Sequence, residues 1–158
     1  SSNGASTLVA RDASGNFAGN QITGVNVNAS SNVNAGADMT ATAWMRGKFS
    51  DDVVDIGNTG SATTINLAAG TIFTAILTDD CTFTFSNPNG TASTGSSFTL
   101  ILTNDATPDR TRVWPASVKF ADGTQQYTNT AGAVDVWFFF TPDGGTTYYG
   151  SSPIKNAS

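Results

Sequence analysis

The sequence lacks the residues on which most enzyme and metal sites depend. It contains no histidine, and its 12 acidic residues are all aspartate, so glutamate is absent as well. Histidine is the usual general base and the commonest metal ligand in proteins. Its absence excludes a Ser-His-Asp or Cys-His arrangement, and a zinc site would have to use aspartates and one cysteine. The composition therefore predicts a protein without catalytic residues, bound metal or cofactor.

Charge and cysteine are also scarce. Charged residues make up 12% of the 158 residues, and the formal net charge is −5. Nucleic acids and anionic membrane surfaces attract lysine and arginine, so neither is an expected partner. No apolar run has membrane-spanning length, which argues against membrane insertion. Cys81 is the only cysteine, so no disulfide can form within the chain, and its alternation with Phe83 and Phe85 predicts a place in the core.

Residues that favour helices are also scarce. Threonine, serine, asparagine and glycine are abundant, whereas the straight-chain residues that fill helices are rare. From residue 51 onward, about eight to ten short apolar stretches alternate with turn signals. No helix long enough for a crossover separates them, so we expect antiparallel sheets. The pattern predicts an all-β fold, with an antiparallel, jelly-roll-like β-sandwich over residues 51–150 and a flexible tail over residues 151–158.

Residues 1–50 have a different texture. They contain strand-like and turn-like stretches but only about eight large apolar residues before position 44, too few to enclose a core. The segment is either a flexible polar leader or a strand-rich segment whose other walls come from neighbouring chains. The strand-and-turn pattern favours the second interpretation, and residues 38–48 could form a short helix or plug at the junction. The candidate subunit-interface residues in this segment are Phe17, Ile22, Val25, Val27 and Val33.

The densest apolar run is Val134–Thr141, in which alternate side chains point to opposite faces of a strand. One face carries Trp137 and Phe139 between an aspartate and a threonine and is too apolar for solvent. We therefore expect Trp137 and Phe139 to contact a second subunit, with sugar stacking as the alternative. The face expected to form the core consists of Val134, Val136, Phe138 and Phe140.

The remaining candidate sites are aspartates and tyrosines. A pair of carboxylates can hydrolyse glycosides, but the aspartate clusters lie in turn-like settings where the side chain bonds its own backbone. Calcium at Asp79 and Asp80, or at Asp143, has no supporting spacing. A stacking surface for sugars could be formed by Trp114, Trp137, Tyr127, Tyr148 and Tyr149. The candidate receptor contacts are the three tyrosines.

Both halves of the chain resemble bacteriophage fibre proteins. Residues 8–22 read LVARDASGNFAGNQI and are similar to a repeat of phage tail-fibre shafts, in which a Leu-Val-Arg-Asp start precedes a Gly-Asn-Phe turn. Five later segments resemble C-terminal modules of phage virion proteins, particularly in phages that infect marine and cyanobacterial hosts. These segments are residues 71–78, 81–88, 98–103, 113–119 and 139–150.

The resemblance implies a non-enzymatic virion structural protein. It implies an intertwined homotrimer in which residues 1–50 form a fibre shaft or trimerisation segment and residues 51–150 form a β-rich tip. We expect location on the virion, at the tail or capsid surface, other virion proteins as partners, and attachment to a host-surface glycan. The alternatives are a capsid-attached fibre or decoration protein that binds only virion partners, and a secreted bacterial carbohydrate-binding module.

Overall fold

The computed structural model describes residues 50–151 and 153–157. These residues belong to a unit that spans residues 47–158, and they form β-strands with a single three-residue 3-10 turn, η1 (Ala121–Gly123). The predicted all-β character is therefore confirmed. The interface candidates Phe17, Ile22, Val25, Val27 and Val33, like the expected shaft and junction, lie outside the described residues.

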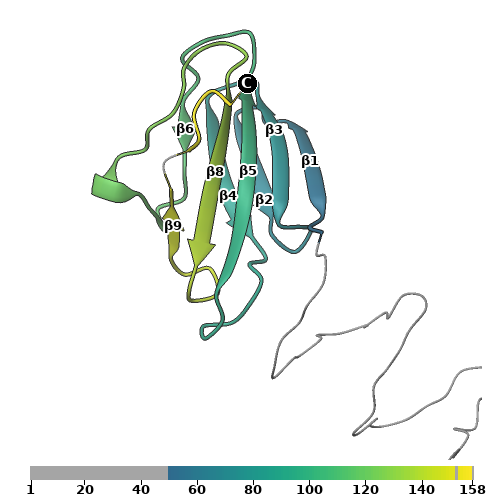
Figure 1. Cartoon of the computed structure of the whole chain (residues 1–158), viewed down its shortest axis with the longest axis vertical. Helices are drawn as coiled ribbons and strands as arrows, with labels where there is room; N and C mark the ends of the chain where they lie inside the picture. The colour runs from purple at the N-terminus through teal and green to yellow at the C-terminus, as the bar shows by residue number, and fades with distance from the viewer. Residues whose placement is uncertain (1–49, 152, 158) are drawn as a thin grey trace, which may run out of the picture. The chain divides into compact units, whose positions relative to one another are not determined.

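The strands form two sheets, which Figure 1 shows as two layers. The larger sheet has the strand order β1 (Val53–Asn58), β3 (Ile72–Leu77), β5 (Ser96–Asn104), β8 (Val134–Thr141), β9 (Tyr148–Gly150) and β7 (Val118–Lys119). The smaller sheet has the order β2 (Ala62–Asn66), β4 (Cys81–Ser86) and β6 (Arg112–Val113).

The first six strands alternate between the two sheets, so the chain winds as a coil from one sheet to the other. β1, β3 and β5 are parallel neighbours in the larger sheet, and β2, β4 and β6 are parallel neighbours in the smaller one. β8 then pairs antiparallel with β5 and with β9. The predicted antiparallel jelly-roll arrangement is therefore wrong for most of the domain. Parallel neighbours need a crossover connection, and here a strand of the facing sheet makes that crossover in place of a helix.

The core lies between the two sheets and is rich in aromatic rings. Phe85 of β4 packs edge-on against Phe98 of β5 and Phe139 of β8, with ring centroids 5.0 and 5.3 Å apart. Trp114, which follows β6, stacks on Phe83 at 4.7 Å. Cys81 is 1% exposed in this core, as predicted, and burial raises the pKa of its thiol.

The two faces of β8 are the reverse of the prediction. Trp137 and Phe139 are 0% and 1% exposed within a single chain, whereas Phe138 and Phe140 are each 46% exposed. Trp137 lies opposite Leu100 and Phe139 opposite Phe98, on the side of β5 that faces the smaller sheet. Trp137 and Phe139 are therefore core residues, and their assignment to a subunit interface is wrong.

Buried hydrogen bonds explain how polar residues share the inner face of β8. The carboxylate of Asp135 accepts hydrogen bonds from the backbone N–H groups of Thr128, at 2.7 Å, and Asn156, at 3.2 Å. The hydroxyl of Thr141 donates to Asp143 Oδ1 and accepts from the N–H of Gly145. Burying a polar group is costly only when it has no partner, so an aspartate and a threonine can flank core aromatics.

The C-terminal tail was expected to be flexible, but its described residues are held against β8. The N–H of Ser151 donates to the carbonyl of Phe138 at 2.9 Å. Val136 and Ile154 exchange two backbone hydrogen bonds, and the N–H of Ala157 donates to the carbonyl of Val134 at 2.8 Å. Beyond β9, the tail lies along the same edge of β8 and supplies hydrogen-bond partners for the backbone groups of β8.

Candidate functional site

The outer face of the larger sheet is the most distinctive surface of the described residues. β5 and β8 place Thr99 opposite Phe138, Ser97 opposite Phe140, and Ile101 opposite Val136 on this face. Seven large apolar side chains are more than about a third exposed in the described part of the chain. Six of them belong to this face: Val53, Ile76, Phe138, Phe140, Tyr149 and Ile154.

The outer face of the smaller sheet provides an internal comparison. Its exposed positions on β2 and β4 are mainly threonines, and the hydroxyls of Thr64 and Thr84 lie 2.7 Å apart in a cross-strand hydrogen bond. Val113 is the one large apolar residue on this face that is markedly exposed. The smaller sheet therefore presents a face suited to water, and the larger sheet does not.

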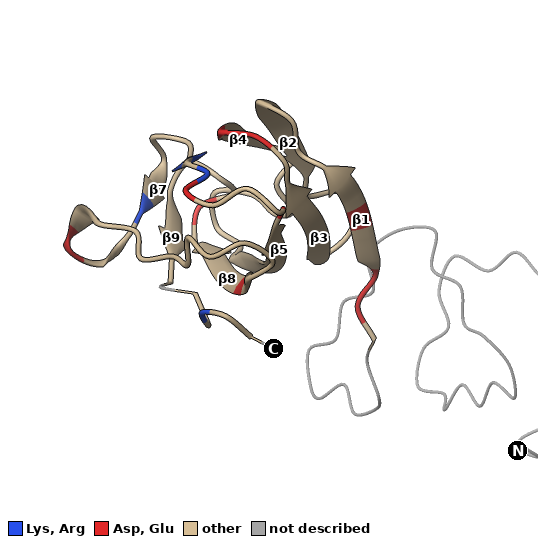
Figure 2. Cartoon of the chain, turned by 90° about the horizontal axis from the view of Figure 1, so that it is seen from above, with Lys and Arg blue, Asp and Glu red and all other residues tan. Residues whose placement is uncertain are grey.

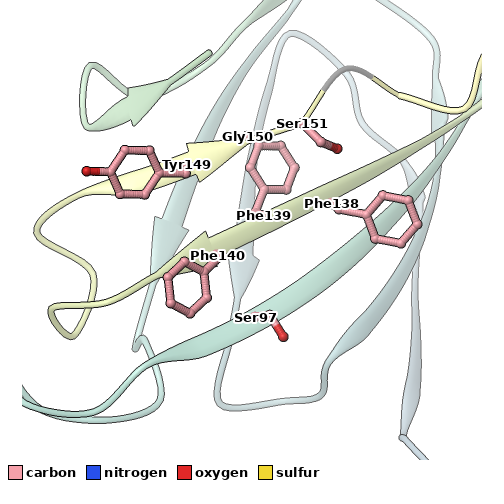
Figure 3. A pocket seen from close by; sticks show the side chains of 7 residues that line it. All are labelled: Ser97, Phe138, Phe139, Phe140, Tyr149, Gly150 and Ser151. Atoms are coloured by element: carbon pink, nitrogen blue, oxygen red, sulfur yellow. The ribbon is translucent and has the colours of Figure 1, made fainter. Parts of the chain in front are cut away.

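A shallow groove of about 350 Å³ crosses the apolar face between β5, β8 and β9. Figure 3 shows the rings of Phe138, Phe140 and Tyr149 around it, with the Ser97 hydroxyl on β5 and Ser151 beyond Gly150. Its walls are thus aromatic, with two serine hydroxyls at the rim. Such a groove can take an apolar side chain from another protein or the apolar face of a sugar ring.

Charge is confined to the borders of this face. β3 and β5 carry no charged residue and are drawn in tan in Figure 2. At the β1 border, Asp55 accepts hydrogen bonds from the Thr74 hydroxyl and the Gly57 N–H, both at 3.0 Å. At the β7 border, Lys119 lies opposite Tyr149 and donates to the carbonyl of Ala116. The β1 border therefore carries Asp55, and the β7 border carries Lys119, with Asp122 of η1 three residues after it.

The three candidate receptor tyrosines do not form one surface. Tyr149 is 55% exposed and lines the groove. Tyr148 points the other way and is buried in the core, where burial raises the pKa of its phenol. Tyr127 is half-buried beneath Arg112, whose guanidinium carbon lies 4.3 Å from the ring centroid. The prediction of a stacking surface built from all three is therefore wrong, and only Tyr149 is freely accessible.

The aspartates make local structural hydrogen bonds. The carboxylate of Asp80 accepts from the N–H of Thr111, and that bond lowers its pKa. The Arg110 guanidinium lies 3.0 Å from Asp105 and, together with the N–H of Thr107, lowers the pKa of that carboxyl. Asp143 accepts from the N–H of Thr147, which lowers its pKa in the same way. These contacts are what turn-forming aspartates make.

The described residues bring no three metal-ligating side chains of the histidine, cysteine or acidic type together. No helix in this part of the chain is long and apolar enough to cross a membrane.

Sequence reasoning missed Phe138 and Phe140 because both faces of β8 are apolar. Alternation decides which residues share a face, but it cannot decide which of two apolar faces is inside. A useful signal lies in β5, where Ser97, Thr99 and Thr103 share the parity that the structure places outside. Pairing the polar side of β5 with β8 would have oriented β8 correctly, but it requires knowing that the two strands are neighbours.

Comparison of the chain with protein-family models, with curated proteins and with solved structures finds no match.

Proposed function

We propose that the chain is a non-enzymatic structural protein of a phage virion, a homotrimeric tail fibre or fibre tip that attaches the virion to the host surface. The observation that carries the proposal is the apolar outer face of the larger sheet, whose central strands β3, β5 and β8 carry no outward charge. A soluble protein rarely leaves such a face in water unless another surface covers it. A chain built to be covered fits an assembly protein better than an enzyme.

Two further features support the proposal. The coil of stacked parallel strands suits a fibre, because stacking strands along one direction lengthens a domain without changing its cross-section. The sparse apolar stripe of residues 1–50 suits a segment whose core is shared between chains around a common axis. The sequence resemblance to phage fibre shafts and virion modules points the same way.

The acids support a structural rather than a catalytic role. Those with lowered pKa values, Asp80, Asp105 and Asp143, accept hydrogen bonds from backbone N–H groups of their own turns or, for Asp80, from the N–H of Thr111 in an adjacent segment. A glycosidase would need one carboxyl with a raised pKa to act as the general acid.

The groove favours a second candidate, a secreted bacterial carbohydrate-binding module. Aromatic rings with hydroxyl groups at the rim suit a pyranose ring, which has one apolar face. A free module would be monomeric and would keep Phe138, Phe140 and Tyr149 open to its ligand.

The mass of the full chain in solution separates the two candidates. Sedimentation equilibrium at micromolar concentration should give three times the 16.3 kDa chain mass. A monomer at that concentration would overturn the trimeric fibre and favour the free module.

A map of the intact virion tests the location, and a glycan array tests attachment. If the chain is a trimeric fibre, the map should show three copies in a projection from the tail or capsid. A copy that contacts only capsid proteins would instead identify a decoration protein.

A further inference from the structure

We propose that the outer face of the larger sheet, centred on Phe138, Phe140 and Tyr149, is the surface through which copies of this chain contact one another. The inference rests on the proposed homotrimer and names the contact surface within it. It replaces the opposite face of β8, which the structure places in the core.

The charge distribution selects a second copy as the occupant. Each chain carries a net charge of −5, so the repulsion between two copies is weakest where they meet through a face that holds few charges. β3 and β5 contribute no charged side chain to the outer face, and the outward residues of β8 are two valines and two phenylalanines. Copies can therefore meet there without burying an unpaired charge, which would cost several kcal/mol.

The margins of the face add a complementary element. Asp55 borders it on β1, and Lys119 borders it on β7 at the far side of the sheet. When identical faces surround a three-fold axis, opposite margins of neighbouring copies approach each other. Asp55 of one copy and Lys119 of the next then carry opposite charges and attract one another.

The amount of exposed apolar surface is in the range that calls for a partner. A fully exposed aromatic side chain presents about 150–250 Å², so Phe138, Phe140 and Tyr149 at 46%, 46% and 55% exposure contribute roughly 300 Å². That already reaches the size of the largest patch on a typical monomer, about 300–600 Å². Val53, Ile76 and Ile154 extend it along the same face toward the roughly 800 Å² per partner of a stable contact.

The test compares matched variants of the full chain by sedimentation equilibrium. Phe138→Asp places a charge in the centre of the face, and Val113→Asp makes the same kind of change at an exposed apolar residue of the smaller sheet. We expect Phe138→Asp to raise the trimer dissociation constant by about 100-fold or more, as loss of a central contact does. Val113→Asp should leave the dissociation constant unchanged.

A second variant and a chemical probe keep the test independent of how well Phe138→Asp folds. Ile76→Asp alters the same face on β3, and circular dichroism with urea unfolding reports whether each variant is folded. In the unsubstituted trimer, tetranitromethane should nitrate Tyr149 at least about 10-fold more slowly than in a dissociated folded variant, because a neighbouring copy covers it.

Each outcome has a distinct meaning. A wild-type monomer overturns the proposed trimer and this contact with it. A wild-type trimer in which folded Phe138→Asp and Ile76→Asp remain trimeric, or in which Tyr149 is nitrated freely, overturns the contact surface alone. A trimer that keeps its mass but loses glycan binding on Phe138→Asp would assign the groove to a sugar and likewise overturn it.

Discussion

Arg112 is a charged residue in the interior, and its partners anchor the connection between β7 and β8. The residue is 2% exposed, and its guanidinium donates to the side-chain carbonyl of Asn104 and to the backbone carbonyls of Arg110 and Thr128. Burial lowers its pKa, which the nearby Asp135 carboxylate partly offsets. One buried side chain therefore joins β6, β5 and the long connection ahead of β8.

Replacing Arg112 tests how much this anchor stabilises the domain. Arg112→Leu leaves buried acceptors without a donor, at about 1–3 kcal/mol for each, so we expect a loss of about 3 kcal/mol in the free energy of unfolding. Arg110→Leu is the control, because its contacts with Asp105 and Asp79 lie near the surface, where ion pairs contribute little, and its loss should be clearly smaller. Urea unfolding measures both, and similar losses for the two variants would contradict the assignment.

Asp143 provides a test of pH dependence. The N–H of Thr147 and the hydroxyl of Thr141, each 2.9 Å from Asp143 Oδ1, lower the pKa of this carboxyl. A group with a lowered folded-state pKa stabilises the protein above its unfolded pKa of about 3.9, and this stabilisation is lost as the pH falls through the folded-state value.

Asp143→Asn should therefore flatten the acid limb of the stability profile. Below about pH 4 the free energy of unfolding should fall less steeply in the variant than in the wild type, because asparagine does not titrate. Urea midpoints between pH 7 and the acid range measure the two slopes. Identical slopes would show that the carboxylate contributes nothing to acid sensitivity.

At the scale of elements, the C-terminal tail acts as an edge strand for β8. Its backbone pairs with Phe138, Val136 and Val134, and the N–H of Asn156 satisfies the buried Asp135 carboxylate. The side chains contribute less, since Ile154 is 57% exposed. The stabilising contacts of the tail are therefore mainly backbone hydrogen bonds.

Removing residues 151–158 should destabilise the domain by about 2–4 kcal/mol, from several hydrogen bonds at about 0.5–1.5 kcal/mol each and a less satisfied Asp135. Hydrogen exchange should also show faster exchange of the Val136 amide, which donates to Ile154. Ile154→Thr is the control, because it keeps the backbone and should cost less than about 0.5 kcal/mol. Unchanged unfolding of the truncated chain would mean that the tail is not a structural strand.

At the scale of the whole molecule, the local sequence pattern predicted the kind of secondary structure that the chain forms. It did not predict how the strands connect and pair. The all-β class and the buried position of Cys81 follow from alternation within a few residues, which sequence displays directly. The direction of pairing does not, because Val53 meets Ile72 and Ile72 meets Thr99 only through turns of the coil. The scarcity of helix-forming residues excluded helical crossovers. It did not indicate that a strand of the facing sheet can make the crossover instead.

The candidate surface likewise depends on contacts between segments of the chain, which the local sequence pattern does not contain. The sequence indicated that one face of Val134–Thr141 needs a cover, and the structure retains such a face. Which face it is depends on the partners of Asp135, the N–H groups of Thr128 and Asn156, which lie in the segments before and after β8 rather than within it. Such partners become neighbours only after folding.

The two ends of the coil differ, and this gives the domain a direction of growth. Among the described residues, β1 pairs only with β3 and β2 only with β4, whereas β8 covers the other side of β5 in the larger sheet (Figure 1). A tandem duplication of the β3–β4 turn would insert one more pair of strands between these ends and lengthen the stack by about 4.8 Å. The antiparallel β8 and its tail would be left intact. Each added turn would therefore lengthen the domain by one step of the stack, and the closing end would stay unchanged.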